Sequence, residues 1–475
     1  MISSGPLTII QPASSVWTTK DMYDNSYINV LNSKGEKVHL TYTSDDVLDH
    51  GQQNLSLCEG DNLMLELVEP SGSRSSVLEM DQIMYAYRGT GFTKNKEKGF
   101  GTSESCQVNV NCSEGNDWQD EKRGVARILV VIPGAQGWCT GSLVNNTRLD
   151  CTPYLLTAMH CAEDVTTSNL NSWRFYFNYE ATGCSNPSSE GLLGTKYTTG
   201  CVKIAASEDI SSSGNLTKSD FYLIHLGSFG SSYQTVNRLK SYNAYWNGWD
   251  ANNTASPRGV GIHHPDGDLK KISHYTATVS SVSYGGVNPN THWMTTWVST
   301  TNGFGVTEPG SSGSPLFNFN GGNSRIVGTL SGGSSTCNFS DKTDLYGKMS
   351  YHWASAGSSS SLQLKPWLDP ESTGLTTIDG SSDPCLGQWL ALDKNNVDVV
   401  SIFPNPTSDK LTVELTDNVL LTDVVLIDLT GKEMDVEFSK STNKIELNIS
   451  NVSKGLYQLI IHTNQGKIVK NILKN

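Results

Sequence analysis

From Cys106 to about Gly380 the chain is a succession of short apolar segments at close spacing, and this pattern restricts its fold more than any other feature of the sequence. The segments include ARILVVIP, GSLVN, YLLTA, RFYFNY, DFYLIHL, HWMTTWV, SPLFNF and RIVGTL. They show little helical periodicity, whereas β-barrels and sandwiches are built from many short strands. The pattern predicts an all-β fold for this central region.

Changes in composition divide the 475 residues into four parts, as expected of a chain too long for one ordinary domain. Residues 1–98 read as short strands with turns, and the polar stretch TKNKEKGFGTSES that follows residue 92 has the character of an exposed, cleavable linker. The region of short apolar segments occupies 99–380, and a second linker covers 381–397. Residues 398–475 alternate apolar and polar side chains in KLTVEL, VVLIDL and KIELNI, which predicts a small β-sandwich.

Charge and cysteine content restrict the partners and the compartment. A formal net charge of −13 argues against nucleic acid or an anionic membrane as the main partner. Ten cysteines among many Gly, Ser, Thr and Asn residues indicate disulfides and an oxidising environment. No apolar run reaches the roughly 20 residues of a membrane-spanning helix. The first residues lack the basic and apolar regions of a signal peptide, so for a secreted protein we expect that signal to have been trimmed.

The turn EPGSSGSPLF, residues 308–317, contains three serines that are candidates for a nucleophile. In an acyl-transfer enzyme, the backbone N–H of the nucleophile and that of the residue two before it point at the developing oxyanion. Ser311 fails because Pro309 has no N–H, and Ser314 is restricted by the proline that follows it. Ser312 satisfies the requirement, with Gly310 supplying the second N–H.

A nucleophilic serine needs a histidine base that is oriented by a buried carboxylate. His160 ends the apolar segment YLLTAMHC, and Cys161 directly after it is placed to form a bridge to Cys139 on the preceding predicted strand. Asp220 in KSDFYLIHLG stands at the mouth of a strongly apolar strand, where an unpaired acid would be costly. His160, Asp220 and Ser312 are therefore the predicted triad.

Residues of about 101–380 resemble the lysyl endopeptidase branch of the trypsin-like serine peptidases. The similarity rests on CTGSLVNNT, LTAMHC, SDFYLIHL, WNGWD with GIHHP, GVTEPGSSGSP and TDLYGK, and the chain order His, Asp, Ser is that of chymotrypsin-type enzymes. The resemblance implies two six-stranded β-barrels with the triad between them. It implies His160 as general base, Asp220 as its orienting acid and Ser312 as nucleophile, with an oxyanion hole at Gly310 and Ser312.

The same resemblance implies how a substrate is recognised. Ordinary trypsins carry the pocket acid six residues before the nucleophile, where this chain has Val306, whereas the lysyl branch takes it from a segment that resembles TDLYG and gives Asp344 here. A carboxylate at the base of an apolar slot selects Lys or Arg. Ser331, Gly332 and Gly333 resemble the segment that pairs with the substrate backbone. Asp344 implies cleavage after Lys. Tyr284 and Ser331 stand where relatives carry Trp and His, and this difference leaves cleavage after Arg open.

Activation and disulfides follow from the same resemblance. Ser311 replaces the Asp that precedes the nucleophile in trypsins, so no ion-pair switch with a new N-terminus is expected. The implied disulfides are Cys106–Cys337, Cys112–Cys184 and Cys139–Cys161; Cys151–Cys201 is a hypothesis from the remaining cysteines, and Cys58 and Cys385 are unassigned. Residues 1–98 then represent a pro-region that covers the site or assists folding. Lys98 is a candidate self-cleavage point, with Lys94 and Lys96 as alternatives.

The last part of the chain resembles the sorting domain of type IX secretion. The residues that carry this similarity are FPNPT at 403–407, DLTGKEM at 428–434 and the terminal GLYQLIIHTNQGKIVKNILKN. The resemblance implies contact with the secretion machinery and a protein that is secreted or held at the cell surface. The domain is normally removed, so no catalytic part is expected of it.

Three functional hypotheses follow: a secreted monomeric serine endopeptidase acting on polypeptides, an inactive relative used as a surface binding module, and a β-rich esterase or acid-preferring peptidase. The complete triad disfavours the second hypothesis, and Asp344 disfavours the third. No cofactor and no metal is expected. His263 and His264, beside Asp266 and Asp268, suggest a metal site, but paired histidines at a turn more often make structural hydrogen bonds.

Overall fold

The computed structural model describes three parts of the chain. It covers 99–385 except 134, 192, 208–217, 228–232, 285–289, 320–323 and 339, and 400–475 except 416–420, 429–432, 435, 442–443 and 464–465. N-terminal to residue 99 it describes 2–3, 9–16, 26–32, 34–37, 41–43, 52–53, 58–59, 62–70 and 79–86. The chain forms two compact units, Met1–Cys385 and Leu386–Asn475. Lys94, Lys96 and Lys98 lie outside the described residues. Most of the linker predicted at 381–397 lies outside them as well.

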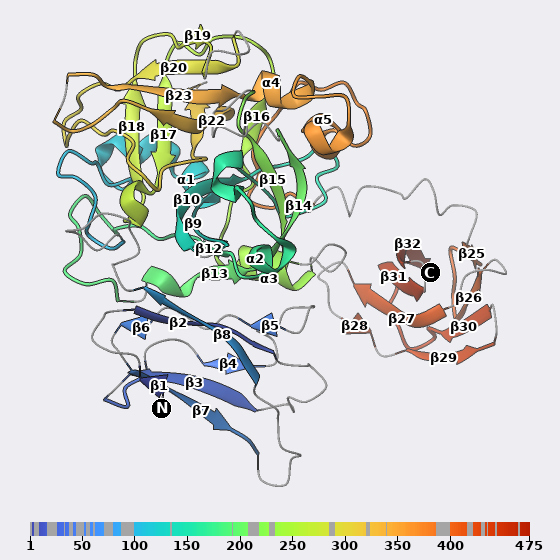
Figure 1. The fold of residues 1–475 in the computed structure, drawn as a ribbon. Coiled ribbons are helices and arrows are strands. Elements are labelled where there is room, and N and C mark those ends of the chain that lie inside the picture. The colour runs from blue at the N-terminus through green and yellow to red at the C-terminus, as the bar shows by residue number, and fades with distance from the viewer. Residues whose placement is uncertain are drawn as a thin grey trace. The chain divides into compact units, whose positions relative to one another are not determined.

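The first barrel is an antiparallel sheet that closes on itself (Figure 1). Its strands are β9 (Val125–Ile132), β10 (Ala135–Leu143), β11 (Tyr154–Thr157), β12 (Arg174–Tyr176), β13 (Tyr197–Thr199), β14 (Cys201–Ala206) and β15 (Tyr222–Leu226). The sheet order β13-β12-β9-β10-β11-β15-β14 begins and ends with two strands that only Gly200 separates. Gly200, with φ 77°, bends the continuous segment formed by β13 and β14. As a result β13 pairs with β12 at one edge of the sheet and β14 pairs with β15 at the other. Six segments thus close the barrel.

The second barrel is closed in the same way. Its strands are β17 (Gly259–His263), β18 (Lys271–Tyr275), β19 (Ser280–Val282), β20 (His292–Thr296), β21 (Pro315–Asn318), β22 (Arg325–Gly333) and β23 (Thr343–Lys348). The order β18-β17-β21-β22-β23-β20-β19 starts and ends with two strands that are consecutive in the chain. Strands β16 (Gly248–Asp250) and β24 (Thr377–Ile378) add to its edge. The predicted all-β fold with two six-stranded barrels is confirmed.

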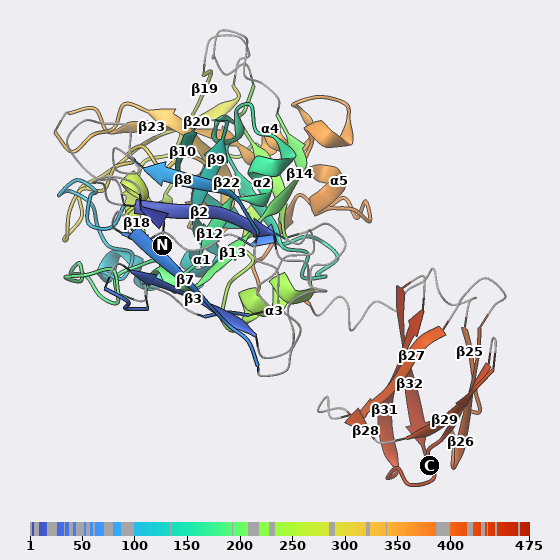
Figure 2. The ribbon, with the colours of Figure 1, turned by 60° about the horizontal axis from the view of Figure 1, so that its bottom comes forward.

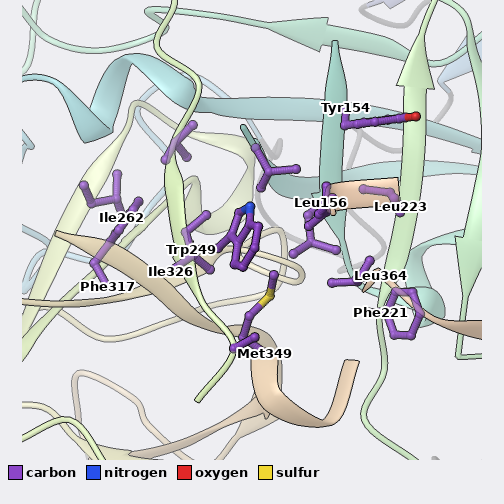
Figure 3. Close-up of a cluster of buried hydrophobic side chains, with 14 of the residues drawn as sticks. Tyr154, Leu156, Phe221, Leu223, Trp249, Ile262, Phe317, Ile326, Met349 and Leu364 are labelled. Carbon is purple, nitrogen blue, oxygen red and sulfur yellow. The ribbon is translucent and has the colours of Figure 1, made fainter. Parts of the chain in front are cut away.

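The largest buried cluster draws side chains from both barrels (Figure 3). Trp249 lies at its centre and is fully buried, with Leu156 and Leu223 of the first barrel to one side and Ile262 and Phe317 of the second barrel to the other. The fully buried apolar surface fixes the two barrels against each other, since burying each such side chain contributes about 1.5–3 kcal/mol. The barrels therefore present their connecting loops to one another in a fixed arrangement.

Helices are few and short in the described residues. They are α1 (Glu121–Gly124), α2 (Thr167–Asn171), α3 (Tyr233–Ser241), α4 (Met349–Ala354) and α5 (Lys365–Leu368), with 3₁₀ turns η2 (Ser113–Trp118), η3 (Met159–Ala162), η4 (Leu193–Thr195), η5 (Pro265–Gly267) and η6 (Ser360–Leu362). None of the described helices is long and apolar enough to cross a membrane.

The N-terminal residues form short strands, as predicted. One sheet has the order β1-β7-β3-β4 and the other joins β5, β2, β6 and β8. Their bounds are β1 (Ile2–Ser3), β2 (Ile9–Val16), β3 (Tyr27–Asn32), β4 (Tyr42–Thr43), β5 (Gln52–Gln53), β6 (Cys58–Glu59), β7 (Asn62–Val68) and β8 (Glu79–Ala86). A turn follows β3, in which Gly35 N–H donates to Asn32 O at 2.9 Å.

The second unit is a β-sandwich of two four-stranded antiparallel sheets (Figure 2). The sheet orders are β25-β26-β30-β29 and β28-β27-β31-β32. The strands are β25 (Val400–Phe403), β26 (Lys410–Leu415), β27 (Leu421–Asp428), β28 (Glu433–Met434), β29 (Glu437–Lys440), β30 (Lys444–Asn448), β31 (Gly455–Thr463) and β32 (Gly466–Lys474). Leu411 and Leu447 of one sheet and Leu459 and Ile461 of the other share one core. This confirms the sandwich predicted from alternation.

Candidate active site

His160 and Asp220 meet at the ends of two paired strands. Thr157 at the end of β11 pairs with Tyr222 at the start of β15, so the segments just beyond these residues emerge side by side. His160 Nδ1 lies 2.8 Å from Asp220 Oδ2, and the His160 backbone N–H donates to Asp220 Oδ1 at 3.0 Å. With Nδ1–H directed at the carboxylate, Nε2 is the ring nitrogen left to accept a proton.

Asp220 is buried and held in a fixed orientation toward its neighbour. Its side chain is fully buried, whereas the side chain of His160 retains 30% of its exposure. Asp220 has φ 62°, a left-handed conformation that costs a non-glycine residue energy and that the surrounding structure must impose. The fold thus accepts local strain to aim this carboxylate at the histidine.

Ser312 lies in the turn before β21 and is placed beside the histidine segment. Its carbonyl oxygen accepts a hydrogen bond from Thr140 N–H of β10 at 2.8 Å and lies 3.9 Å from Cys161 Sγ. A β-carbon on the next residue, Gly313, would collide with Thr157 Oγ1 and the backbone of Ala158. Only glycine allows the turn of the second barrel to approach the first barrel this closely.

Two N–H groups of this turn are free to bind an oxyanion. Gly310 and Ser312 donate no backbone hydrogen bond to any acceptor among the described residues, whereas the N–H of Ser311 between them donates to Glu308 O at 2.9 Å. Gly310 adopts φ 98°, which favours glycine. Two backbone N–H groups without a backbone acceptor among the described residues therefore flank Ser311 in this turn.

Buried hydrogen bonds hold the turn. His263 Nδ1 lies 2.9 Å from Ser311 Oγ and its Nε2 lies 3.0 Å from Ser273 Oγ. Burial lowers the pKa of His263 to about 3, so the ring is neutral and bridges the two hydroxyls. His264 Nδ1 lies 2.9 Å from the carbonyl oxygen of Asp268. The preference for structural hydrogen bonds over a metal site at the histidine pair agrees with these contacts.

Asp344 lies on β23 with its side chain buried. Its Oδ2 accepts from Trp297 Nε1 at 2.5 Å, Thr307 Oγ1 at 2.8 Å and Ser335 Oγ at 2.7 Å, while Ser335 N–H lies 3.4 Å from Oδ1. Burial raises the pKa of Asp344, and the donated hydrogen bonds oppose that rise. A carboxylate that is buried in this way without a charged hydrogen-bond partner among the described residues suits a cationic ligand group.

The segment Ser331, Gly332 and Gly333 ends β22 next to this carboxylate. The register between β22 and β23 shifts between Leu330 and Gly332, so Ser331 forms a bulge in the ladder. A β-carbon on Gly332 would lie 3.2 Å from the hydroxyl of Tyr284, which places that tyrosine over the segment. The structure therefore gathers all of the predicted substrate-binding residues in one region.

His292 on β20 belongs to the same region and was not among the predicted residues. It is fully buried, its Nε2 lies 3.0 Å from Ser331 Oγ and its ring centroid lies 5.2 Å from that of Tyr284. Burial lowers its pKa to about 4, so it is neutral at physiological pH. The segment THWMTTWV carries no signal that separates this histidine from a core residue.

Disulfides join segments of the peptidase region that are distant in the sequence. The structure contains Cys106–Cys337, Cys112–Cys184 and Cys139–Cys161, with Cα–Cα distances of 5.6, 4.2 and 6.5 Å. The hypothesis of a Cys151–Cys201 bridge is wrong: Cys151 pairs with Cys385, and Cys201 is a buried free thiol. Cys201 belongs to the same buried cluster of the first barrel as Leu170 and Leu226. The side chain of Cys58 lies outside the described part.

Two regions of the chain match families of known proteins. Residues 401–475 match the model of a secretion system C-terminal sorting domain, which marks the protein as secreted or held at the cell surface. A lysyl endopeptidase of Pseudomonas aeruginosa is 29% identical over 313 residues, which are 62% of this chain. The chain spans 62% of the length of that relative.

Among solved structures, the fold is similar to protease Anisep from Arthrobacter nicotinovorans, with 15% identity, a TM-score of 0.34, and coverage of 49% of this chain and 92% of that one. A thermostable serine protease, AL20, from an extremophilic microorganism has 14% identity and a TM-score of 0.32, with 48% and 93% covered. Residues 100–347 match the model of the lysyl endopeptidase C-terminal domain. Because these residues make up more than half of the chain, the chain belongs to the lysyl endopeptidase family of serine endopeptidases.

Proposed function

We propose that this protein is a secreted serine endopeptidase that hydrolyses peptide bonds after Lys through an acyl-enzyme. The observation that carries the proposal is the buried Asp220 paired with His160 at 2.8 Å beside the turn of Ser312. Inactive relatives that serve as binding modules have usually lost a member of this set, and nothing in a binding function requires two free N–H groups beside a serine hydroxyl.

The reaction uses these groups in sequence. His160 Nε2 takes the proton of Ser312 Oγ as that oxygen attacks the scissile carbonyl carbon, and Asp220 stabilises the imidazolium that forms. The carbonyl oxygen becomes an oxyanion that the N–H groups of Gly310 and Ser312 bind. The intermediate collapses, the C–N bond breaks, and the imidazolium gives its proton to the leaving amine. Water then repeats the sequence on the ester and releases the acid and the serine.

Asp344 is the proposed specificity residue, and its hydrogen bonds favour Lys over Arg. Three donors occupy Oδ2, whereas the one donor near Oδ1 is 3.4 Å away. A guanidinium binds a carboxylate best through both oxygens, but an ammonium is a compact charge that one oxygen can bind. The less occupied Oδ1 therefore suits the lysine side chain.

The backbone of the substrate is proposed to pair with residues Ser331–Gly333, next to Tyr284. Strand β21 pairs with β22 only as far as Thr329, so on that side no strand among the described residues pairs with Ser331–Gly333, and an extended peptide can add to such an edge. The two glycines leave space above Asp344 for the side chain that precedes the scissile bond.

We further propose a pro-region at 1–98, a peptidase domain from 99, and a sorting domain at 398–475. The peptidase domain extends beyond the expected residue 380, because Ser381 and Trp246 exchange two backbone hydrogen bonds of 2.9 Å and Cys385 is bridged to Cys151. This puts the proposed end of the peptidase at Cys385 and shortens the linker to 386–397. The enzyme is proposed to act as a monomer on polypeptides, with the sorting domain engaging the secretion machinery.

Labelling with a fluorophosphonate tests the catalytic assignment. The reagent phosphonylates a serine only where a base and an oxyanion hole activate it, so processed protein should gain one adduct that maps to Ser312 by peptide mass spectrometry. Ser312→Ala should take up none, and Ser314→Ala, in the same turn, should label as the unchanged protein does. An unlabelled protein, or an adduct on another serine, would contradict the assignment.

A further inference from the structure

Asp268 is a fully buried carboxylate outside the triad and the specificity site. It follows η5, whose residues come directly after His263 and His264 at the end of β17. The nearest cation is Lys271, with Nζ 3.9 Å from Oδ2, which is too long for a hydrogen bond. Besides this buried ion pair, Asp268 accepts hydrogen bonds from a distant segment of the chain.

That segment is the start of the peptidase domain. Gly101 N–H donates to Asp268 Oδ1 at 2.6 Å, and Ser103 donates to Oδ2 from its hydroxyl at 2.5 Å and from its N–H at 3.3 Å. A second carboxylate, on Glu308, accepts from Glu104 N–H at 3.1 Å and from Gln107 Nε2 at 2.5 Å. Two acids thus bind residues 101–107, and one of them belongs to the turn of the nucleophile.

The loop that carries Asp268 packs against the other side of this turn. Asp266 N–H donates to Pro309 O at 2.6 Å. Gly310 lies so close that a β-carbon there would be 2.8 Å from Gly267 N and 2.9 Å from His264 O. The contact leaves no room for Gly310 to move toward the loop, so residues 264–268 limit the position of Gly310 on this side.

One side chain of the first barrel ties the two loops together. Thr140 Oγ1 donates to Gly310 O at 2.8 Å and accepts from His264 N–H at 3.1 Å. Hydrogen bonds therefore connect residues 101–103 to the loop 264–268 and that loop to the turn 308–312, with Asp268 at the first of these two contacts.

We propose that Asp268 is a positioning residue that uses residues 101–103 to fix the loop 264–268 against Gly310, and so preorganises the oxyanion hole. The inference rests on the proposed function, since it concerns the same serine. Ser311 stands where trypsins carry an acid for an N-terminal ion pair, and in this chain backbone N–H groups within the N-terminal segment provide the tie instead. Their donation to a charged acceptor gives stronger hydrogen bonds than neutral pairs do.

The experiment compares kinetics and ligand binding in three variants of the full chain after processing. Asp268→Asn keeps the size of the side chain but replaces one acceptor oxygen by a donor, and Ser103→Ala removes one donor from the other side of the same contact. Ser113→Ala is the matched control, because this serine bonds to Glu114 and Asn302 and does not touch the loop.

Three measurements separate positioning from general stability. The first is kcat and KM on a peptide p-nitroanilide with Lys before the scissile bond. The second is the inhibition constant of a lysine boronic acid, which forms a tetrahedral adduct on the serine. The third is the inhibition constant of n-butylamine, which imitates the lysine side chain and requires the specificity site alone.

Deleting one oxyanion donor costs about 10²–10³ in kcat, so a displaced donor should cost less. We expect Asp268→Asn to lower kcat about 10-fold and to weaken boronate binding by a similar factor, with KM and butylamine binding within about 2-fold. Ser103→Ala should show a smaller change of the same kind, and Ser113→Ala none.

Unchanged kcat in Asp268→Asn, or an equal loss of butylamine and boronate binding, would overturn the inference while leaving the proposed function intact. Failure of the unmodified enzyme to cleave the anilide or to bind the boronate would instead contradict the proposed function itself.

Discussion

Gly333 lies directly opposite Asp344 in the pairing of β22 with β23, and a β-carbon at residue 333 would collide with Asp344 Oδ1. The oxygen in question is the one that hydrogen bonds leave most available. A glycine at this position therefore keeps a side chain of the protein itself away from Oδ1.

Replacing this glycine should close the specificity site. Gly333→Ala is expected to lower kcat/KM for a Lys substrate by about 100-fold, since a methyl group takes the place of the charged ligand at Oδ1. Steady-state kinetics on Lys anilides measure the effect. Gly183→Ala, at a glycine that has open space around it and no positive φ, controls for the loss of a glycine. Unchanged kinetics in Gly333→Ala would mean that the substrate does not reach Oδ1.

Neutralising Asp344 should remove basic specificity with little damage to the fold. In Asp344→Asn the three donors at Oδ2 select the amide oxygen, so the NH₂ group points toward the arriving ammonium and repels it. We expect a loss of at least 100-fold in kcat/KM for Lys substrates, with much smaller change for substrates that carry Leu at that position. Equal losses on both substrates would indicate that Asp344 acts through stability instead.

Buried glutamates should make the protein less stable as the pH rises. Burial raises the pKa of Glu121, which is 5% exposed, from 4.5 to about 7. The folded state then holds a proton that the unfolded state has lost, so this contribution is fully present below pH 4.5 and disappears as the pH rises through 7. It amounts to on the order of 3 kcal/mol. Thermal unfolding of Glu121→Gln at pH 4.5, 5.5 and 7 should show a flatter decline.

The surface residue Glu371, whose side chain is 60% exposed, supplies the control for this series. Glu371→Gln should retain the slope of the unmodified protein between pH 4.5 and 7. Glu308, whose pKa burial also raises to about 7, should contribute to the slope that remains in Glu121→Gln. A slope in Glu121→Gln equal to that of the unmodified protein would contradict the assignment.

The pairing of Cys151 with Cys385 predicts a definite pattern of linked peptides. Non-reducing digestion of the processed enzyme should give one species that joins these two residues, together with the three other bridges. Cys201 should react with iodoacetamide only after denaturation, because burial raises its pKa and removes it from solvent. A peptide that joins Cys151 to Cys201 would show that the structure assigns these cysteines wrongly.

Local patterns sufficed where the signal lies within a few residues. Short apolar segments predicted the strands. The prolines around Ser312 made it the predicted nucleophile, and that assignment stays a prediction. The closure of the first barrel by a bend at Gly200 was not predictable, because the two halves of one strand pair with segments far away in the sequence.

Contacts between distant residues were missed for the same reason. Cys385 falls in a polar linker, and only the folded chain brings it beside Cys151, 234 residues earlier. Asp268 was noted merely as an acid near two histidines, since its partners Gly101 and Ser103 precede it by more than 160 residues. His292 has the sequence context of a strand core, and its proximity to Ser331 depends on how β20, β23 and β22 stack in the sheet.

The most direct test of the proposed activity is a profile of cleavage sites. A denatured protein mixture is digested with the processed enzyme, the residues before each cut are identified by mass spectrometry, and Ser312→Ala is the control. We predict cuts after Lys, with Arg far less frequent because Asp344 offers one open oxygen. Equal cutting after Lys and Arg would contradict the lysine preference, and no cuts above the control would contradict the assignment of this chain as an active endopeptidase.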